Sequence, residues 1–371
     1  MRRHWLDNLR WVTVILVLIY HVFYFYNNKG VFGGIGGFVD NPMAQPQDVL
    51  MYILYPWLMM LFFLMAGISA RYSLEKHPIR EWFRVRTRKL LVPSTIGLLV
   101  FQWMVGYFNA RWYLPEGIPA LVKWPIYAIS GIGPLWFIQD LWLFSLIMPL
   151  FKRLDDRYRF HEFCGRLSAP ILVLAGGVIV FLASQLLIMH PRENSADGLL
   201  NLYKPLTYFI LFLMGYFVFS NEAAQDKVAK VHKPLLFCAI AAGIALVWIG
   251  WGNDYTSPQY LSGWLNCLYA WLMILAMLGL FKARFDRTDR FRGYMSRSSY
   301  GIYIVHYLII VAVGTFLKAY CANWLCYVVL LTAVLFLSPA IYEILRRIPV
   351  VRWCVLGIKQ DTASQKKSMT K

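Results

Sequence analysis

The sequence has few charged residues. Only 15% of its 371 residues are charged, while 59% are hydrophobic. Soluble globular domains carry about 25% charged residues, so this composition excludes an ordinary water-soluble protein and is typical of a membrane protein. Acidic residues are scarcer still, with 19 Asp and Glu against 37 Lys and Arg, which gives a formal net charge of +18. The distribution of these basic residues along the chain shows which kind of partner the excess indicates.

The sequence also lacks several motifs that would indicate a function. The six cysteines form no C-x-x-C pair and have no histidine at metal-ligand spacing, so we interpret them as apolar side chains and predict no metal site. No internal repeat recurs at a fixed period, which argues against a solenoid and against a simple inverted-repeat transporter. No small-residue A-x-A site follows the first apolar run, so we expect that run to be retained as a helix.

Long apolar runs fill most of the chain. A helix needs roughly 20 apolar residues to cross about 30 Å of hydrocarbon, and ten runs qualify. The sequence therefore predicts an all-α, polytopic integral membrane protein with about ten transmembrane helices. The ten runs are 9–26, 50–70, 90–108, 133–151, 168–189, 203–220, 234–251, 261–281, 299–317 and 322–345.

The positive charge is distributed unevenly across these runs. With both termini placed in the cytoplasm, 31 of the 37 Lys and Arg fall in inside segments and 6 in outside segments. This follows the positive-inside rule, and it places the basic surface where it meets anionic lipid rather than nucleic acid. The longer outside segments, 27–49 and 109–132, are rich in Gly, Pro and aromatic residues and are predicted to be loops. The polar segment 359–371 is predicted to be a disordered cytoplasmic tail that follows a transmembrane domain over 1–358.

The first apolar run carries a basic residue and an imidazole. Arg10 and His21 are eleven residues apart, and at about 100° per residue this spacing places both side chains within about 20° of one helix face. They stand about 16 Å apart along the axis, so Arg10 is expected at the cytoplasmic interface and His21 beyond the bilayer centre. An ionisable group at that depth is expensive and indicates function. The simpler alternatives are a snorkelling anchor for Arg10 and a helix-helix hydrogen bond for His21.

Further polar residues lie within or beside other apolar runs. Asp140 falls in the outer half of the fourth run, and we interpret it either as an active-site group or as one partner of a structural pair. His306, in the ninth run, is either a packing residue or a supporting residue of the site. Asp7 lies three residues before Arg10 and is expected to form a local ion pair that orients the guanidinium.

Several segments resemble signatures of the bacterial acyltransferase 3 family. The stretch "LDNLRWVTVILVLIYHV" is similar to the family's first-helix signature, matched by Asp7, Arg10 and His21. "FFLMAGISARYSLEK", "RVRTRKLLVP", "GPLWFIQDLWLFSL" and "SSYGIYIVHYLII" are similar to its later motifs, so the resemblance covers about 6–306. One departure concerns the basic R-x-x-R stretch, where Lys89 stands at the second position unless the register begins at Arg84 or Arg88. Lysine keeps the charge but lacks the bidentate fork for phosphate.

The resemblance implies an O-acyltransferase of the bacterial cytoplasmic (inner) membrane. Its donor would be cytoplasmic acyl-CoA, with no permanently bound cofactor, and its acceptor a hydroxyl of an extracytoplasmic carbohydrate or cell-envelope glycan. His21 would be a catalytic residue, as general base or as acyl carrier. We add Asp140 as a second catalytic candidate from its buried position, to orient His21 or the acceptor. The basic residues that would hold the donor phosphates are Arg10, Arg84, Arg86, Arg88 and Lys89, although anchoring by the positive-inside rule also explains 84–89.

Three other functions remain open. A polytopic transporter without acyl-transfer chemistry would also have many helices with buried charges. A different class of intramembrane acyltransferase would use His306 in place of His21. A sensor or scaffold without chemistry would leave the spacing of Arg10 and His21 unexplained. The sequence does not define the acyl group, the acceptor or the oligomeric state.

Overall fold

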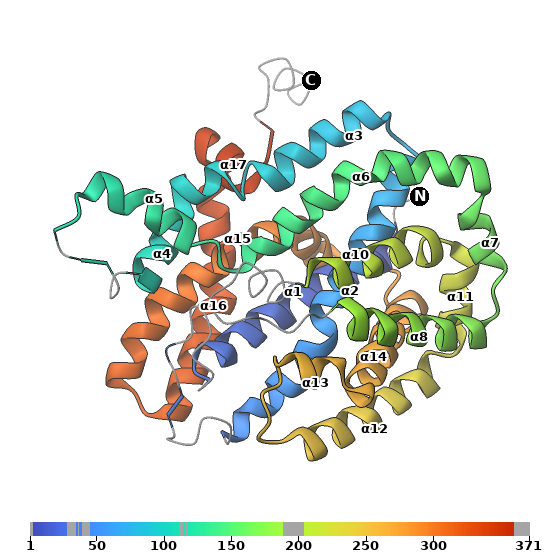
Figure 1. Cartoon of the computed structure of the whole chain (residues 1–371). Helices are drawn as coiled ribbons and strands as arrows, with labels where there is room; N and C mark the ends of the chain where they lie inside the picture. Colours follow the sequence, from blue (N-terminus) through green and yellow to red (C-terminus); the bar gives the residue numbers. More distant parts are fainter. Residues whose placement is uncertain are drawn as a thin grey trace. The chain divides into compact units, whose positions relative to one another are not determined.

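The computed structural model describes residues 3–27, 35, 37, 38, 45–110, 114, 115, 117–187 and 204–359. Within these residues the regular structure is entirely helical (Figure 1). The predicted all-α, multi-pass membrane architecture is therefore confirmed. The predicted tail lies almost wholly at 360–371, outside the described residues.

Eight predicted runs coincide with helices of the described chain that are long and apolar enough to cross a membrane. Their apolar stretches reach 18 residues or more, close to what a bilayer requires. These eight are α1 (His4–Phe25), α2 (Val49–Leu74), α6 (Trp136–Tyr158), α8 (Ala169–Leu187), α12 (His232–Gly250), α14 (Trp264–Arg284), α15 (Arg290–Tyr320) and α16 (Asn323–Leu345).

Neither of the other two predicted runs forms a single helix of spanning length within the described residues. The run 203–220 corresponds to α10 (Pro205–Met214) and the π-helical η5 (Gly215–Phe219), after which the chain bends by 95° into α11 (Glu222–Lys230). The run 90–108 contains the end of the π-helical η2 (Thr87–Leu91), then π-helical η3 (Leu98–Gln102) and α4 (Trp103–Ala110). Their crossing of the membrane, and the cytoplasmic location of both termini, stay predictions.

The chain forms two compact units, each assembled from two segments. Unit 1 comprises Met1–Ile79 and Leu146–Ser299, and unit 2 comprises Arg80–Ser145 and Tyr300–Lys371. The single domain over 1–358 stays a prediction. The remaining helices are η1 (Pro46–Asp48), α3 (Ile79–Arg86), α5 (Ala120–Ser130), η4 (Gly133–Leu135), α7 (Phe160–Arg166), α13 (Pro258–Ser262) and α17 (Pro349–Leu356).

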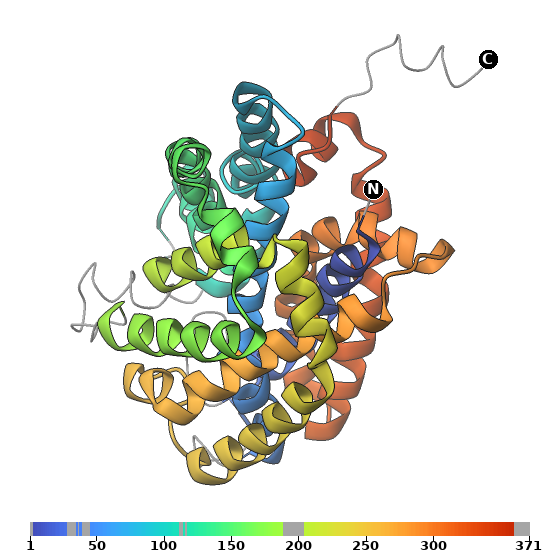
Figure 2. The ribbon, with the colours of Figure 1, turned by 90° about the vertical axis from the view of Figure 1, so that its right-hand side faces the viewer.

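Unit 1 is organised around α2. This helix packs against α1, α10 and α14, and α14 also packs against α12 (Figures 1 and 2). Small residues allow one of these crossings, because a Cβ on Gly67 would collide with the carbonyl of Phe212 and a Cβ on Gly215 with that of Leu64. Close backbone approach through small residues is how transmembrane helices associate without a hydrophobic driving force. These two glycines allow α2 to pack closely against α10 and η5.

Unit 2 contains a helical hairpin of α4 and α5 (Figure 1). Its helices also meet through glycines, since a Cβ on Gly106 would collide with the carbonyl of Tyr127 and one on Gly131 with that of Gln102. The expectation of a loop over 109–132 is therefore wrong for its second half. The local sequence concealed the helix, because α5 has only 11 residues and contains Pro125.

Candidate active site

His21 lies in the last two turns of α1, in unit 1. Its Nδ1 is 2.9 Å from the carbonyl oxygen of Val17, one turn earlier. Because a carbonyl can only accept, Nδ1 donates in this bond, and Nε2 is then the ring nitrogen that can take up a proton. The rings of Tyr20 and Tyr24 contact the imidazole edge-on, with centroids 5.2 and 6.4 Å away. The backbone hydrogen bond fixes the tautomer, and the two rings restrict the orientation of the imidazole.

Arg10 lies three turns before His21 and is held from two sides. Its Nη1 donates to Asp7 Oδ1 at 3.0 Å, and its Nη2 donates to Ser69 Oγ of α2 at 2.9 Å. The side chain remains 36% exposed. Two of the five N–H donors of the guanidinium are thus engaged, and no other partner of Arg10 is found within the described residues.

The helix face between these two residues is packed inside the protein. Val14 and Val17 lie on that face and are 4% and 1% exposed. Arg10 and His21 therefore stand at the two ends of a buried stripe of α1 rather than on an open side of the helix. This contrasts with Ile15 and Ile19, which belong to another face and are partly exposed.

The predicted basic stretch lies in unit 2, at the end of α3 and in η2. Arg84 is exposed, whereas Arg86 is partly buried, with its guanidinium 4.9 Å from the centre of the Trp82 ring and its Nη1 3.3 Å from Ser145 Oγ. Arg88 donates through Nε to the carbonyl of Gly357 at 3.2 Å. The π-helical turn changes the side-chain direction within this short segment, a geometry that is frequent at functional sites.

The backbone of the basic stretch is held by other parts of unit 2. The hydroxyl of Tyr300 donates to the carbonyl of Lys89, whose side chain is exposed. Gly357 ends α17 with a positive φ of 61°, and a Cβ there would lie 2.6 Å from the carbonyl oxygen of Arg88. The first and last side chains of the basic stretch, Arg84 and Lys89, are thus exposed, whereas Arg88 between them is bound to the end of α17.

Asp140 and His306 also belong to unit 2. The Oδ2 atom of Asp140 is buried and has no hydrogen-bond partner within the described chain, a costly arrangement for a carboxyl group. His306 is fully buried, with Nδ1 2.6 Å from the carbonyl oxygen of Tyr303, and the Tyr303 hydroxyl donates to the carbonyl of Pro134. Gln139, the residue before Asp140, does have a partner, because its side-chain amide donates to the carbonyl of Ser94 at 3.0 Å.

The predicted site residues therefore fall into two sets. Asp7, Arg10 and His21 share α1 in unit 1, whereas 84–89, Asp140 and His306 lie in unit 2. A joint phosphate site made by Arg10 and the basic stretch stays a prediction. Within the described residues, no cluster of three or more His, Cys, Asp or Glu side chains could hold a metal ion.

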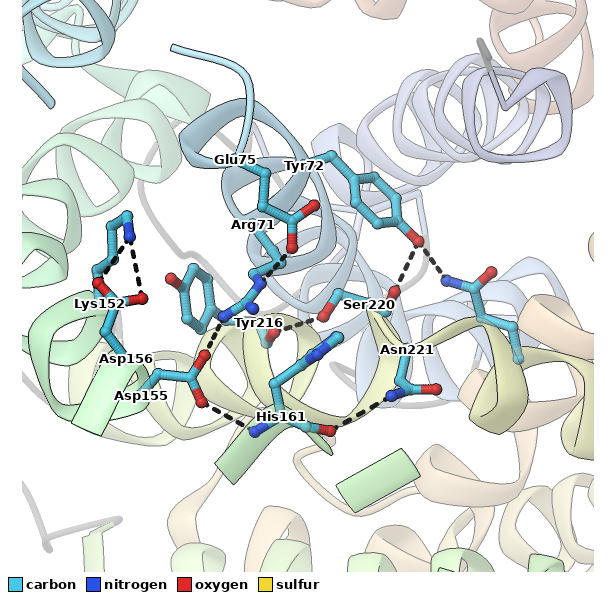
Figure 3. Close-up of polar contacts among 11 residues, drawn as sticks. Arg71, Tyr72, Glu75, Lys152, Asp155, Asp156, His161, Tyr216, Ser220 and Asn221 are labelled. Carbon is cyan, nitrogen blue, oxygen red and sulfur yellow. Dashed lines mark hydrogen bonds and ion pairs between the residues drawn. The ribbon is translucent and has the colours of Figure 1, made fainter. Parts of the chain in front are cut away.

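A second polar cluster in unit 1 was not foreseen. Arg71 of α2 forms ion pairs with Asp155 of α6 and with Glu75, and its guanidinium lies 5.3 Å from the centre of the Tyr216 ring (Figure 3). Asp155 also accepts a hydrogen bond from the backbone N–H of His161 at 2.9 Å. This cluster, which we call the Arg71 clamp, joins α2, the corner between α6 and α7, and η5.

Sequence reasoning also missed the serines that contact the arginines. Ser69 and Ser145 are each 59 positions away from the arginine that they bind. No local pattern connects residues at that separation, and a serine within an apolar helix is an ordinary occurrence.

Comparison with known proteins assigns the chain to a family. Residues 3–343 match a family described as an acyltransferase domain. The chain is similar to "Glucans biosynthesis protein C" of Escherichia coli (strain SMS-3-5 / SECEC) and of Shigella boydii serotype 4 (strain Sb227), with 23% identity covering 96% of this chain and 94% of each relative. It is 22% identical, with the same coverage, to the protein of that name from Escherichia coli O157:H7. No solved structure matches at a significant level. The chain therefore belongs to the acyltransferase 3 family and is a multi-pass membrane acyltransferase.

Proposed function

We propose that the protein transfers an acyl group, of acetyl or succinyl type, from cytoplasmic acyl-CoA to a hydroxyl of an extracytoplasmic glycan at the bacterial cytoplasmic membrane. The observation that carries this proposal is the pairing of Arg10 and His21 on one buried stripe of α1, with Nδ1 of His21 bonded to its own helix. The relatives' name, which refers to glucan biosynthesis, supports a glucan as the acceptor.

The reaction follows from the properties of these groups. His21 Nε2 removes the proton of the acceptor hydroxyl as its oxygen attacks the thioester carbonyl, and the carbon-sulfur bond then breaks. The imidazolium returns the proton to the departing thiolate of CoA, so that the products are the ester and free CoA. Arg10 binds a phosphate of the donor by charge-assisted hydrogen bonds. In unit 2, Arg84, Arg86, Arg88 and Lys89 bind further donor phosphates, and Asp140 orients the acceptor.

The spacing along α1 fits a long donor. The guanidinium and the imidazole stand about 16 Å apart along the helix axis. A donor with a phosphorylated head and an extended pantetheine arm would reach from one to the other. In this proposal Arg10, at one end, binds the donor, and His21, at the other end, takes part in the reaction.

The test measures free CoA released by the purified protein in nanodiscs, with acyl-CoA and a glucan acceptor. His21→Ala should lower turnover by about 10²–10⁴-fold, the usual contribution of a general base. His232→Ala is the matched control, because His232 also bonds through Nδ1 to a carbonyl of the preceding turn, that of Ala229, at 2.6 Å. Its turnover should equal that of the wild type.

Two outcomes would contradict the proposal. CoA release that is unchanged in His21→Ala would remove this histidine from the chemistry. Loss of turnover in His306→Ala together with full activity in His21→Ala would move the catalytic base to unit 2. A burst of free CoA without acceptor, stoichiometric with the protein, would indicate an acyl-histidine, and a strict requirement for the acceptor supports direct attack by the hydroxyl.

A further inference from the structure

Ser69 connects two helices of unit 1 through a single oxygen. Its hydroxyl donates to the carbonyl of Met65, one turn earlier in α2, at 2.8 Å. The same oxygen accepts the hydrogen bond from Arg10 Nη2 at 2.9 Å. Since a hydroxyl has one hydrogen and two lone pairs, the bond to Met65 fixes the rotation of the hydroxyl and directs its lone pairs away from the helix.

This arrangement determines the orientation of the Arg10 guanidinium. Asp7 holds Nη1 from the same helix, and Ser69 holds Nη2 from α2. Two contacts on different nitrogens define the plane of a rigid, planar group. The remaining N–H donors have no partner within the described residues, and they keep one fixed direction. A neutral hydroxyl does this without cancelling the positive charge, as a second carboxylate would.

The same device recurs in unit 2. Ser145 of α6 donates to the carbonyl of Leu141 at 2.6 Å and accepts from Arg86 Nη1 at 3.3 Å. Its side chain is fully buried, so the hydroxyl is held in one place. Trp82 covers a face of the Arg86 guanidinium. Each unit thus has one arginine of the predicted donor site that is oriented by a serine on a neighbouring helix.

We propose that Ser69 and Ser145 are positioning residues, which aim the guanidinium groups of Arg10 and Arg86 at the phosphates of the CoA donor. The inference rests on the proposed function, because it needs these arginines to bind the donor. Neither serine touches the reacting atoms. Their effect is therefore expected on donor binding, in KM and Kd, and not on kcat.

The experiment measures the Kd of CoA and the KM and kcat for acyl-CoA with the full-length protein in nanodiscs. Ser69→Ala should raise the Kd and the KM by about three- to tenfold, the range of one hydrogen bond, and leave kcat unchanged. Ser69→Thr, which keeps the hydroxyl, should restore binding. Ser145→Ala should behave in the same way, in parallel with Arg86→Ala.

A double-mutant cycle tests whether the serine acts through its arginine. In the Arg10→Ala background, Ser69→Ala should have no further effect on CoA binding. The matched control is Ser298→Ala, because Ser298 makes the same bond to its own helix, to the carbonyl of Tyr294 at 2.9 Å, and no arginine contact of Ser298 is found in the described chain. This control should bind CoA like the wild type.

The outcomes separate this inference from the proposed function. If Arg10→Ala weakens CoA binding and Ser69→Ala does not, the positioning role is wrong and the function stands. Independent, multiplicative effects of the two substitutions would also overturn it. If Arg10→Ala leaves CoA affinity intact, the donor site itself fails, and the inference with it. Should Ser69→Ala fail to yield folded protein, Ser69→Cys, a weaker acceptor of similar size, must still weaken binding.

Discussion

Two arginines near the end of α2 have opposite surroundings: Arg71 belongs to this helix, and Arg10 of α1 contacts it through Ser69. Arg71 is 15% exposed and forms ion pairs with Asp155 and Glu75, while its guanidinium lies against the Tyr216 ring (Figure 3). Arg10 is 36% exposed and contacts one carboxylate, that of Asp7, and one hydroxyl, that of Ser69. In the first, two carboxylates neutralise the charge. In the second, the cation is oriented but keeps donors for a ligand.

The difference shows that a cation near a membrane helix end does not by itself indicate binding. The Arg71 clamp links three parts of unit 1 and also holds a sharp corner, where Arg159 has a positive φ of 55° between α6 and α7. Such a closed network has a structural role. A cation that binds a ligand needs N–H donors without protein partners, and the contacts of Arg10 fit the proposed binding role in this respect.

The largest effect is expected from breaking the clamp. Asp155→Ala leaves Arg71 partly buried without its main partner, which costs about 3–5 kcal/mol of stability for a buried pair. Thermal unfolding in nanodiscs measures this loss. The control is Asp156→Ala, since Asp156 is exposed and pairs with Lys152, a type of bond worth about 1 kcal/mol or less. The contrast between the arginines fails if Asp155→Ala weakens CoA binding and leaves the unfolding temperature unchanged.

The opposite pattern is expected at Arg10. Arg10→Ala should weaken CoA binding by about 10- to 100-fold, the range of one or two charge-assisted hydrogen bonds, or about 1.4–2.8 kcal/mol. Its unfolding temperature should stay close to that of the wild type, because the side chain is partly exposed. Arg10→Lys should recover only part of the affinity, since lysine lacks the planar fork. A variant that loses stability but retains CoA affinity would make Arg10 a second structural cation.

Local sequence was sufficient for the membrane helices and for the α1 face. Hydropathy identified eight spans because a bilayer imposes a minimum apolar length, and the helical period placed Arg10 and His21 on one face. It was not sufficient where the chain bends or pairs at long range. The 95° turn after η5 and the short helix α5 lie in segments whose composition resembles a plain span and a loop.

The ion-pair partners of the cations could not be predicted from local sequence either. Arg10 lies at the start of one apolar run and Arg71 directly follows another, and both contribute equally to the positive-inside count. Which of them is neutralised depends on Asp155, a residue 84 positions away from Arg71. Contacts of this kind are set by tertiary packing, and a single sequence contains no period or motif that encodes them.

A smaller effect extends the comparison to the cations of unit 2. Gly357→Ala imposes a left-handed conformation on alanine, which costs about 1–2 kcal/mol, and its Cβ would lie within 2.8 Å of the backbone of Arg88 and Lys89. Gly252→Ala is the matched control, because Gly252 has a φ of 85° and open space around it. Both variants should lose stability, and Gly357→Ala alone should weaken CoA binding. Equal CoA affinity in the two variants would show that the position of the basic stretch does not matter for the donor.

The smallest effect concerns the pH dependence of the Arg71 clamp. His161, outside the membrane-spanning segments, has a pKa lowered from its ordinary value by burial and by the charge of Arg71, against the opposing carboxylates of Asp155, Glu75 and Glu162. Its ring turns into the cluster (Figure 3), and its Nε2 has no hydrogen-bond partner within the described residues. The folded protein therefore holds this imidazole neutral where the unfolded chain, with a pKa near 6.5, takes up a proton.

Stability should fall as the pH drops through the pKa of His161 in the unfolded chain, and His161→Gln should make the decline shallower. Thermal unfolding at pH 7.5 and pH 5.5 compares the two slopes. Parallel slopes would mean that the folded clamp takes up this proton as readily as the unfolded chain does, and Arg71 would then share its site with a second cation at pH 5.5.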